Sequence, residues 1–83
     1  MKILYFAWLR ERLNRGEEEV SPPPEVLTVG DLIDWLAARD EAFAHAVEKR
    51  SLIRAAVDAR LARHDAPLGG AQVVALFPPM TGG

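Results

Sequence analysis

Apolar and polar positions change their spacing several times along the chain, and each change predicts an element. Residues 2–7 are apolar on both faces, which predicts a strand inside a sheet. Residues 8–14 follow as a short helix, which Gly16 ends. Residues 17–21 predict a second strand that pairs with the first. The three prolines that follow it indicate an extended spacer.

The middle of the chain predicts two helices. Thr28 and Asp31 have the spacing of a capping box, in which each residue satisfies a free backbone amide of the other. Residues 41–48 predict a second, shorter helix that Asp40 caps, and we expect Trp35 to lie on the flank of the first helix. The apolar stripe of that first helix follows the helical period at Val29, Leu32, Ile33 and Leu36.

The last third of the chain returns to strand patterns. We expect a strand over residues 52–59, a further stretch over 60–63, a turn through 65–70 and a final strand over 72–77. This order of elements predicts an α+β fold of the β-grasp type. In it a mixed sheet packs on one main helix, with short helices added. The first and last strands, the most apolar, should be parallel neighbours at the centre.

Length and composition limit the function. A chain of 83 residues, 49% apolar and 27% charged, predicts one folded domain with little room for an enclosed active site. We expect the β-grasp domain to span residues 1–77 and residues 78–83 to form a flexible tail. The net charge is −2 and no basic cluster occurs, which argues against nucleic acid as a partner.

Other classes of protein are also disfavoured. Cysteine is absent, so neither a disulfide nor a side-chain thiol can take part. The apolar start of the chain stops at Arg10, too early to cross a membrane, so the cytoplasm is the expected location. His45 and His64 lie far apart without suitable partner ligands, so we expect both to face solvent and to bind no metal.

The final seven residues are the most informative part of the sequence. Two prolines stop the last strand, and two glycines end a segment that has few side chains, Phe77-Pro78-Pro79-Met80-Thr81-Gly82-Gly83. Because glycine lacks Cβ, such a segment can thread a narrow channel of another protein. We expect the Gly83 carboxylate to react there. The channel would be occupied by Pro78, Pro79, Met80, Thr81 and Gly82.

Strand alternation also predicts a docking face. If Val74 and Leu76 face the helix, the remaining side chains of the last strand face outward. We expect these three residues to form the partner interface, with Phe77 as its anchor beside Ala75 and Val73.

Four segments occur together and in order in a family with this layout: Phe6-Ala7-Trp8-Leu9-Arg10-Glu11, Ala55-Ala56-Val57-Asp58, Ala66-Pro67-Leu68 and the final seven residues. The chain resembles the small, sulfur-carrying subunit of molybdopterin synthase, one of the ubiquitin-like sulfur carriers. The resemblance runs from Met1 to Gly83 and is most specific at the end. Where the family usually has an acidic turn before the last strand, this chain has Gly69-Gly70-Ala71-Gln72.

The resemblance implies a reaction at the end of the chain. A ubiquitin-activating-type adenylyltransferase would use ATP to adenylate Gly83, and a sulfur donor protein would convert the adenylate to a thiocarboxylate. The large molybdopterin synthase subunit would then pass that sulfur to precursor Z, forming the molybdopterin dithiolene within a heterotetramer. This chain would bind no cofactor and would be a co-substrate rather than a catalyst by itself.

Two alternatives use the same fold. One is a sulfur carrier for thiamine synthesis or tRNA thiolation, or a ubiquitin-like modifier that is joined to lysines through Gly83. The other is a ubiquitin-like binding module whose tail takes no part in chemistry. A mass measurement of the C-terminus separates the second alternative from the carriers, and the partner that co-purifies separates the carriers from one another.

Overall fold

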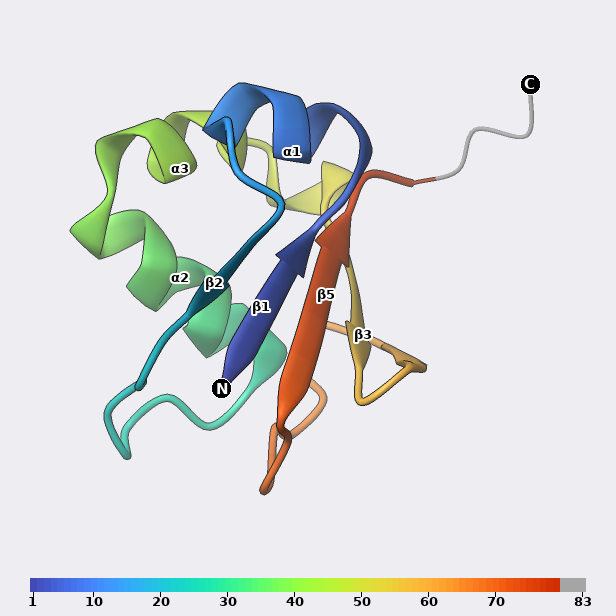
Figure 1. Cartoon of the computed structure of the whole chain (residues 1–83). Coiled ribbons are helices and arrows are strands. Elements are labelled where there is room, and N and C mark those ends of the chain that lie inside the picture. The colour runs from blue at the N-terminus through green and yellow to red at the C-terminus, as the bar shows by residue number, and fades with distance from the viewer. Residues whose placement is uncertain (80–83) are drawn as a thin grey trace.

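A computed structural model describes residues 1–79 of the chain (Figure 1). Its strands are β1 (Lys2–Tyr5), β2 (Glu17–Glu19), β3 (Arg54–Val57), β4 (Arg60–Ala62) and β5 (Val73–Phe77). Its helices are α1 (Ala7–Leu13), α2 (Val29–Arg39) and α3 (Glu41–Ala46), with a 3₁₀ turn, η1 (Arg50–Leu52). The predicted α+β class is confirmed: a mixed sheet packs on one main helix accompanied by shorter ones.

The five strands form one sheet in the order β2-β1-β5-β3-β4. β1 and β5 run parallel, with Ile3 opposite Val74, and every other neighbouring pair is antiparallel. The first and last strands are therefore neighbours in the sheet, as the sequence predicts. The connection between parallel strands must cross over the sheet, and the helices lie in that connection.

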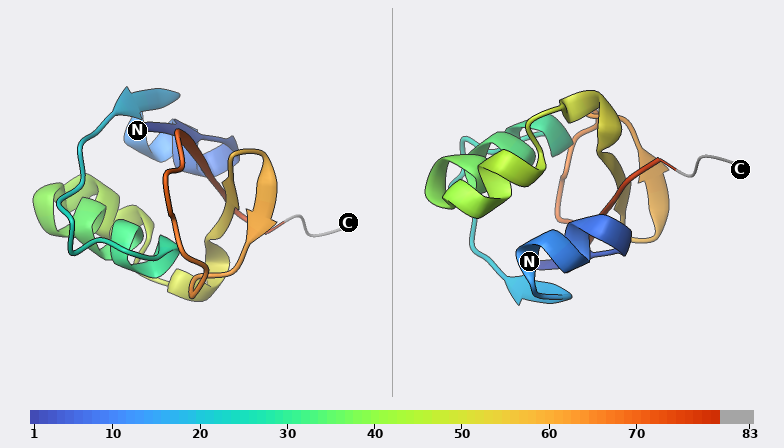
Figure 2. Two further views of the ribbon diagram at one scale, coloured as in Figure 1. Left: turned by 90° about the horizontal axis from the view of Figure 1, so that it is seen from below. Right: turned by 90° about the horizontal axis from the view of Figure 1, so that it is seen from above.

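Helices cover one face of this sheet. α2 and α3 lie on the same side in both views of Figure 2, and α1 lies near the sheet end from which the chain leaves β5 (Figures 1 and 2). The core between the layers holds side chains with no solvent exposure from both, among them Ile3, Tyr5, Leu9, Val29, Leu32, Ile33, Val74 and Leu76. The helical stripe that the sequence predicts is thus buried against the sheet, while Trp35 packs half-buried at its border.

Every predicted strand is longer than the real one, and the first and third differ most. The first ends at Tyr5 rather than at residue 7, because the chain turns at Phe6 and Ala7, the first residue of α1, takes a φ of 57°. The strand expected over residues 52–59 extends only from Arg54 to Val57. Before it the chain forms η1, and after it Asp58 and Ala59 both have positive φ, as a two-residue hairpin turn requires.

Smaller differences occur at other boundaries. The second strand stops at Glu19 rather than at residue 21, and α3 stops at Ala46 rather than at residue 48. The last strand begins at Val73 instead of residue 72. There the Asp58 carboxylate accepts hydrogen bonds from the backbone amides of Gln72 and Val73, which ties the hairpin turn to the start of β5.

Polar contacts fix the helices relative to β2. Thr28 and Asp31 form the predicted capping box at the start of α2. The Tyr5 hydroxyl donates to Glu18, and Arg15 bridges Glu18 and Asp40 at 3.1 and 2.6 Å. The pKa of Asp40 is therefore held below its usual value, chiefly by Arg15, whereas burial raises the pKa of Tyr5. This network joins β2 to the junction of α2 and α3.

Candidate docking surface and tail root

The sheet face opposite the helices is the candidate functional surface. Along β5, Val74 and Leu76 are fully buried toward the helices, whereas Val73, Ala75 and Phe77 alternate with them and remain partly exposed. The strand thus has the two-sided arrangement that its sequence predicts. Whether the three outward residues bind a partner stays a prediction.

Pairing between strands extends this face beyond β5. Ala75 lies opposite Leu4 on β1 and Ala56 on β3, and Ala56 in turn lies opposite Leu61 on β4. Opposed residues in a sheet share a face, so these side chains form one apolar band across four strands. Leu61 is 82% exposed at its outer end, an unusual position for a leucine.

The chain leaves the sheet at the end of this band. Phe77 lies opposite Arg54, and half-buried Pro78 and Pro79 follow it. Phe6 lies next to the end of β5, where its backbone amide donates to the Leu76 carbonyl, and its side chain is 46% exposed. The remaining residues predicted to occupy a partner's channel or to react, Met80, Thr81, Gly82 and Gly83, lie outside the described part of the chain.

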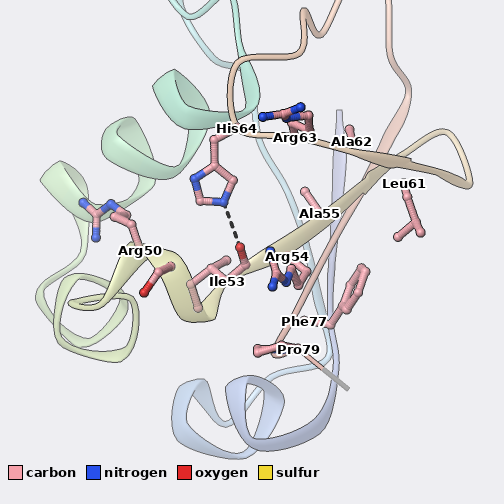
Figure 3. A pocket seen from close by; sticks show the side chains of 11 residues that line it. Arg50, Ile53, Arg54, Ala55, Leu61, Ala62, Arg63, His64, Phe77 and Pro79 are labelled. Atoms are coloured by element: carbon pink, nitrogen blue, oxygen red, sulfur yellow. Dashed lines mark hydrogen bonds between the residues drawn. The ribbon is translucent and has the colours of Figure 1, made fainter. Parts of the chain in front are cut away.

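We call Phe77, Pro78 and Pro79 the tail root. A groove of about 800 Å³ adjoins it (Figure 3). Its apolar lining is formed by Ile53, which follows η1, by Ala55 on β3, by Leu61 and Ala62 on β4, and by Phe77 and Pro79. Its basic lining consists of Arg50, Arg54, Arg63 and His64. We call it the arginine groove after its three arginines. No acidic side chain is among its lining residues in the described part of the chain.

Only one of the three arginines has an acidic neighbour in the described chain. Arg50 contacts Asp34 at 3.1 Å and also donates to the Val47 carbonyl, which holds it against the end of α3. Arg54 and Arg63 are exposed and take part in no ion pair within residues 1–79. The groove therefore carries uncompensated positive charge on an otherwise acidic protein.

The histidine prediction is half wrong. His45 is exposed as expected, but His64 is half-buried, and its Nε2 lies 2.7 Å from the Ile53 carbonyl to which it donates. The reason is the turn after β4, whose backbone packs closely on α2: the Gly30 amide donates to the His64 carbonyl, and a Cβ at Gly30 would lie 3.2 Å from that oxygen. The hydrogen bond from His64 to the Ile53 carbonyl therefore stabilises this turn. Within residues 1–79, no group of three side chains could hold a metal ion.

Sequence reasoning missed Phe6, Leu61 and the basic groove. The signal for Leu61 was present, because a two-residue turn at Asp58 and Ala59 places Leu61 opposite Ala56, on the same face as Ala75. Recognising that turn required a left-handed conformation at an alanine, φ 71°, which its sequence does not indicate. The groove joins residues from η1, β3, β4 and the tail root, so only the folded arrangement brings them together.

These features define a ubiquitin-like β-grasp domain. The chain belongs to the ThiS family, whose model matches residues 3–83. It is 39% identical to the molybdopterin synthase sulfur carrier subunit of Escherichia coli strain K12 over 83 residues, which cover 100% of this chain and 99% of that protein.

Solved structures agree with this placement. A putative molybdopterin converting factor, subunit 1, from Pyrococcus furiosus superposes with a TM-score of 0.72 at 30% identity, covering 95% of both chains. The small archaeal modifier protein 1 of Haloferax volcanii gives the same TM-score of 0.72 at 25% identity, again over 95% of both chains. The predicted resemblance to ubiquitin-like sulfur carriers is therefore confirmed. None of the helices in residues 1–79 has the length and apolar character needed to cross a membrane.

Proposed function

We propose that this protein carries sulfur on the carboxyl group of Gly83 and acts as the small subunit of a molybdopterin synthase. The observation that carries the proposal is the 39% identity to a sulfur carrier subunit over the length of both chains. The sequence after β5 supports it. Two prolines restrict the backbone there, and the two glycines have no side chains that would block entry into a narrow channel. The absence of cysteine leaves no side-chain thiol to carry the sulfur.

The chemistry begins with a poor electrophile. A C-terminal carboxyl group has a reference pKa of about 3.5, so it is an anion at neutral pH and resists attack by a sulfur nucleophile. In the proposed reaction a carboxylate oxygen of Gly83 displaces pyrophosphate from ATP on an adenylyltransferase partner. Hydrosulfide-level sulfur delivered by a donor protein then attacks the acyl carbon and expels AMP, so that a C–S bond replaces the C–O bond to AMP and a thiocarboxylate remains. The large subunit uses this sulfur on precursor Z, in the cytoplasm where ATP is available, and this chain binds no cofactor itself.

Docking on the large subunit would use the outer face of the sheet. Phe77 is its proposed anchor, with Ala75 and Val73 beside it and the newly found Leu61 and Phe6 near the tail root. Four residues beyond Pro79 extend at most about 14 Å, enough to enter a partner's pocket while the domain stays outside. The partner supplies the pocket and the proton transfers, and this domain supplies the reacting atom.

The decisive experiment is a mass measurement. Co-expression with the adenylyltransferase and the sulfur donor should raise the mass of the intact chain by about 16 Da, the change when one oxygen is replaced by sulfur at the C-terminus. The matched control is a variant that lacks Gly83, which should keep its fold and gain no sulfur. Unmodified parent protein under conditions that load a known sulfur carrier would overturn the proposal.

A modifier role is the second candidate, and the similarity to a small archaeal modifier protein supports it. In that case the same acyl adenylate would end in an amide bond to a lysine of another protein. Peptide mass spectra of cell extracts distinguish the two roles, since a modifier leaves a branched peptide ending in Gly82-Gly83. A plain binding module would yield neither the branched peptide nor the added sulfur.

A further inference from the structure

β4 leaves one side of the sheet open next to the arginine groove. β4 is the terminal strand of the sheet and, within residues 1–79, pairs only with β3. Along such an edge, alternate residues turn their N–H and C=O groups away from the sheet. An open edge of this kind is a template for another extended chain.

The charges around this edge select what can pair with it. Arg60 begins β4, Arg63 follows its end, and Arg54 lies on the neighbouring strand, all of them exposed. A second copy of this chain pairing through β4 would bring the same arginines together, and like charges that face each other across strands are destabilising. An acidic chain would instead neutralise them.

The positions of the guanidinium groups favour an extended occupant over a compact one. In Figure 3, Arg50 lies at the η1 end of the groove, Arg54 beside Phe77, and Arg63 at the turn after β4. These side chains are spread along the groove and do not converge on a single point. A small anion would contact one of them at a time, whereas a strand with an acidic side chain at every second position reaches several.

We propose that β4 and the arginine groove bind an extended acidic segment of a partner protein as a sixth strand. Its backbone pairs with the free edge of β4, and its carboxylates contact Arg54 and Arg63. Leu61, which is 82% exposed without such a partner, lies on the same face as Arg54, so the acidic side chains pass beside it and the apolar side chains lie on the other face, next to Ala62. This site does not require that Gly83 carries sulfur, so it stands apart from the proposed function.

The test uses the ¹⁵N-labelled full chain and an octapeptide of alternating valine and glutamate, blocked at both ends. We expect amide shifts in residues 54–56 and 60–64, slower hydrogen exchange along β4, and binding that weakens as salt is raised. The same peptide with glutamine in place of glutamate should bind at least about tenfold more weakly, because it lacks the charge contacts.

Two double variants localise the site. Arg54→Glu with Arg63→Glu should weaken binding of the acidic peptide by at least about tenfold. Arg12→Glu with Lys49→Glu changes the net charge equally, on the surface of α1 and after α3, and should leave binding within about twofold of the parent. The spectrum of each variant verifies its fold. Deleting Gly83 should not change the affinity, which separates this proposal from sulfur transfer.

Four results would overturn the inference. Equal losses in both double variants would mean that the peptide responds only to overall charge. Shifts along β2, or no slowing of exchange along β4, would exclude pairing at this edge. Inorganic phosphate that reproduces the same shifts at a similar concentration would identify a site for small anions instead of a protein segment.

Discussion

The two faces of the sheet are made from the same strands but have different roles. On the inner face, Val74 and Leu76 have no solvent exposure and contact a continuous helical layer. On the outer face, Ala75 and Phe77 are only half-covered, and Leu61 is 82% exposed. The inner face stabilises the fold by burying apolar surface, whereas the outer face leaves similar surface available to a partner. The inner face therefore accounts for stability, and the outer face is the one on which we propose that a partner binds.

A change at the end of the tail should give the largest difference between the effect on sulfur loading and the effect on folding stability. Adding one alanine after Gly83 moves the reacting carbonyl by about 3.5 Å, which takes it out of its position for attack. We expect thiocarboxylate formation to be lost completely and the melting temperature to be unchanged. Intact-protein mass and thermal unfolding measure the two effects. Sulfur loading of the extended, unprocessed chain would show that the position of the end is unimportant.

On the inner face, Leu76→Ala should cost about 2–5 kcal/mol of folding free energy, since it leaves a cavity in a fully buried site. That is a large part of the stability of a small domain. Urea unfolding gives the value, and the affinity of the remaining folded protein for the large subunit should be nearly unchanged. A loss below about 1 kcal/mol would mean that the helical layer collapses readily onto the gap.

On the outer face, Phe77→Ala should show the reverse pattern. We expect binding to the large subunit to weaken by about 2 kcal/mol, as truncation of an aromatic anchor typically does, with a smaller cost in folding. Calorimetric titration and urea unfolding, run beside Leu76→Ala, give the two numbers. A variant that unfolds as easily as Leu76→Ala but binds normally would place Phe77 in the core and remove the distinction between the faces.

The smallest expected effect concerns the polar link on the helical side. Arg15 lowers the pKa of Asp40, so their ion pair stabilises the fold above the unfolded pKa of about 4 and is lost as pH falls toward the lower folded value. Asp40→Asn should therefore cost less than about 1 kcal/mol at pH 7 and progressively less as the pH falls below about 4. Asparagine also caps helices well, which leaves the ion pair as the main difference. A cost that persists unchanged in acid would show that the ion pair with Arg15 is not its source.

The spacing of residues in the sequence predicts the helices of this protein more completely than its sheet. The Thr28–Asp31 capping box and the stripe through Leu32 and Ile33 depend on residues three or four positions apart, so sequence spacing is sufficient to predict them. The parallel neighbours β1 and β5 also follow, because both are strongly apolar and the helices lie between them in sequence.

The unpredicted features depend on contacts between distant residues. The bounds of β3 follow from where β5 pairs with it and from the left-handed turn at Asp58 and Ala59. His64 turns inward because the Ile53 carbonyl lies within reach, 11 positions earlier in the chain. Sequence alternation gave the outward side of β5, but the width of the apolar band and the arginines beside it depend on strand order.

The position of β5 has a consequence for how the chain reaches its folded state. This strand is near the end of the sequence, yet it lies in the middle of the sheet with β1 on one side and β3 on the other. Until Val73–Phe77 has been synthesised, β1 lacks its parallel neighbour and the sheet is divided into two hairpin-like halves. Synthesis from the N-terminus therefore delays closure of the domain until its last strand emerges. A chain that stops before Val73 lacks the middle strand of its sheet, so it cannot complete this fold.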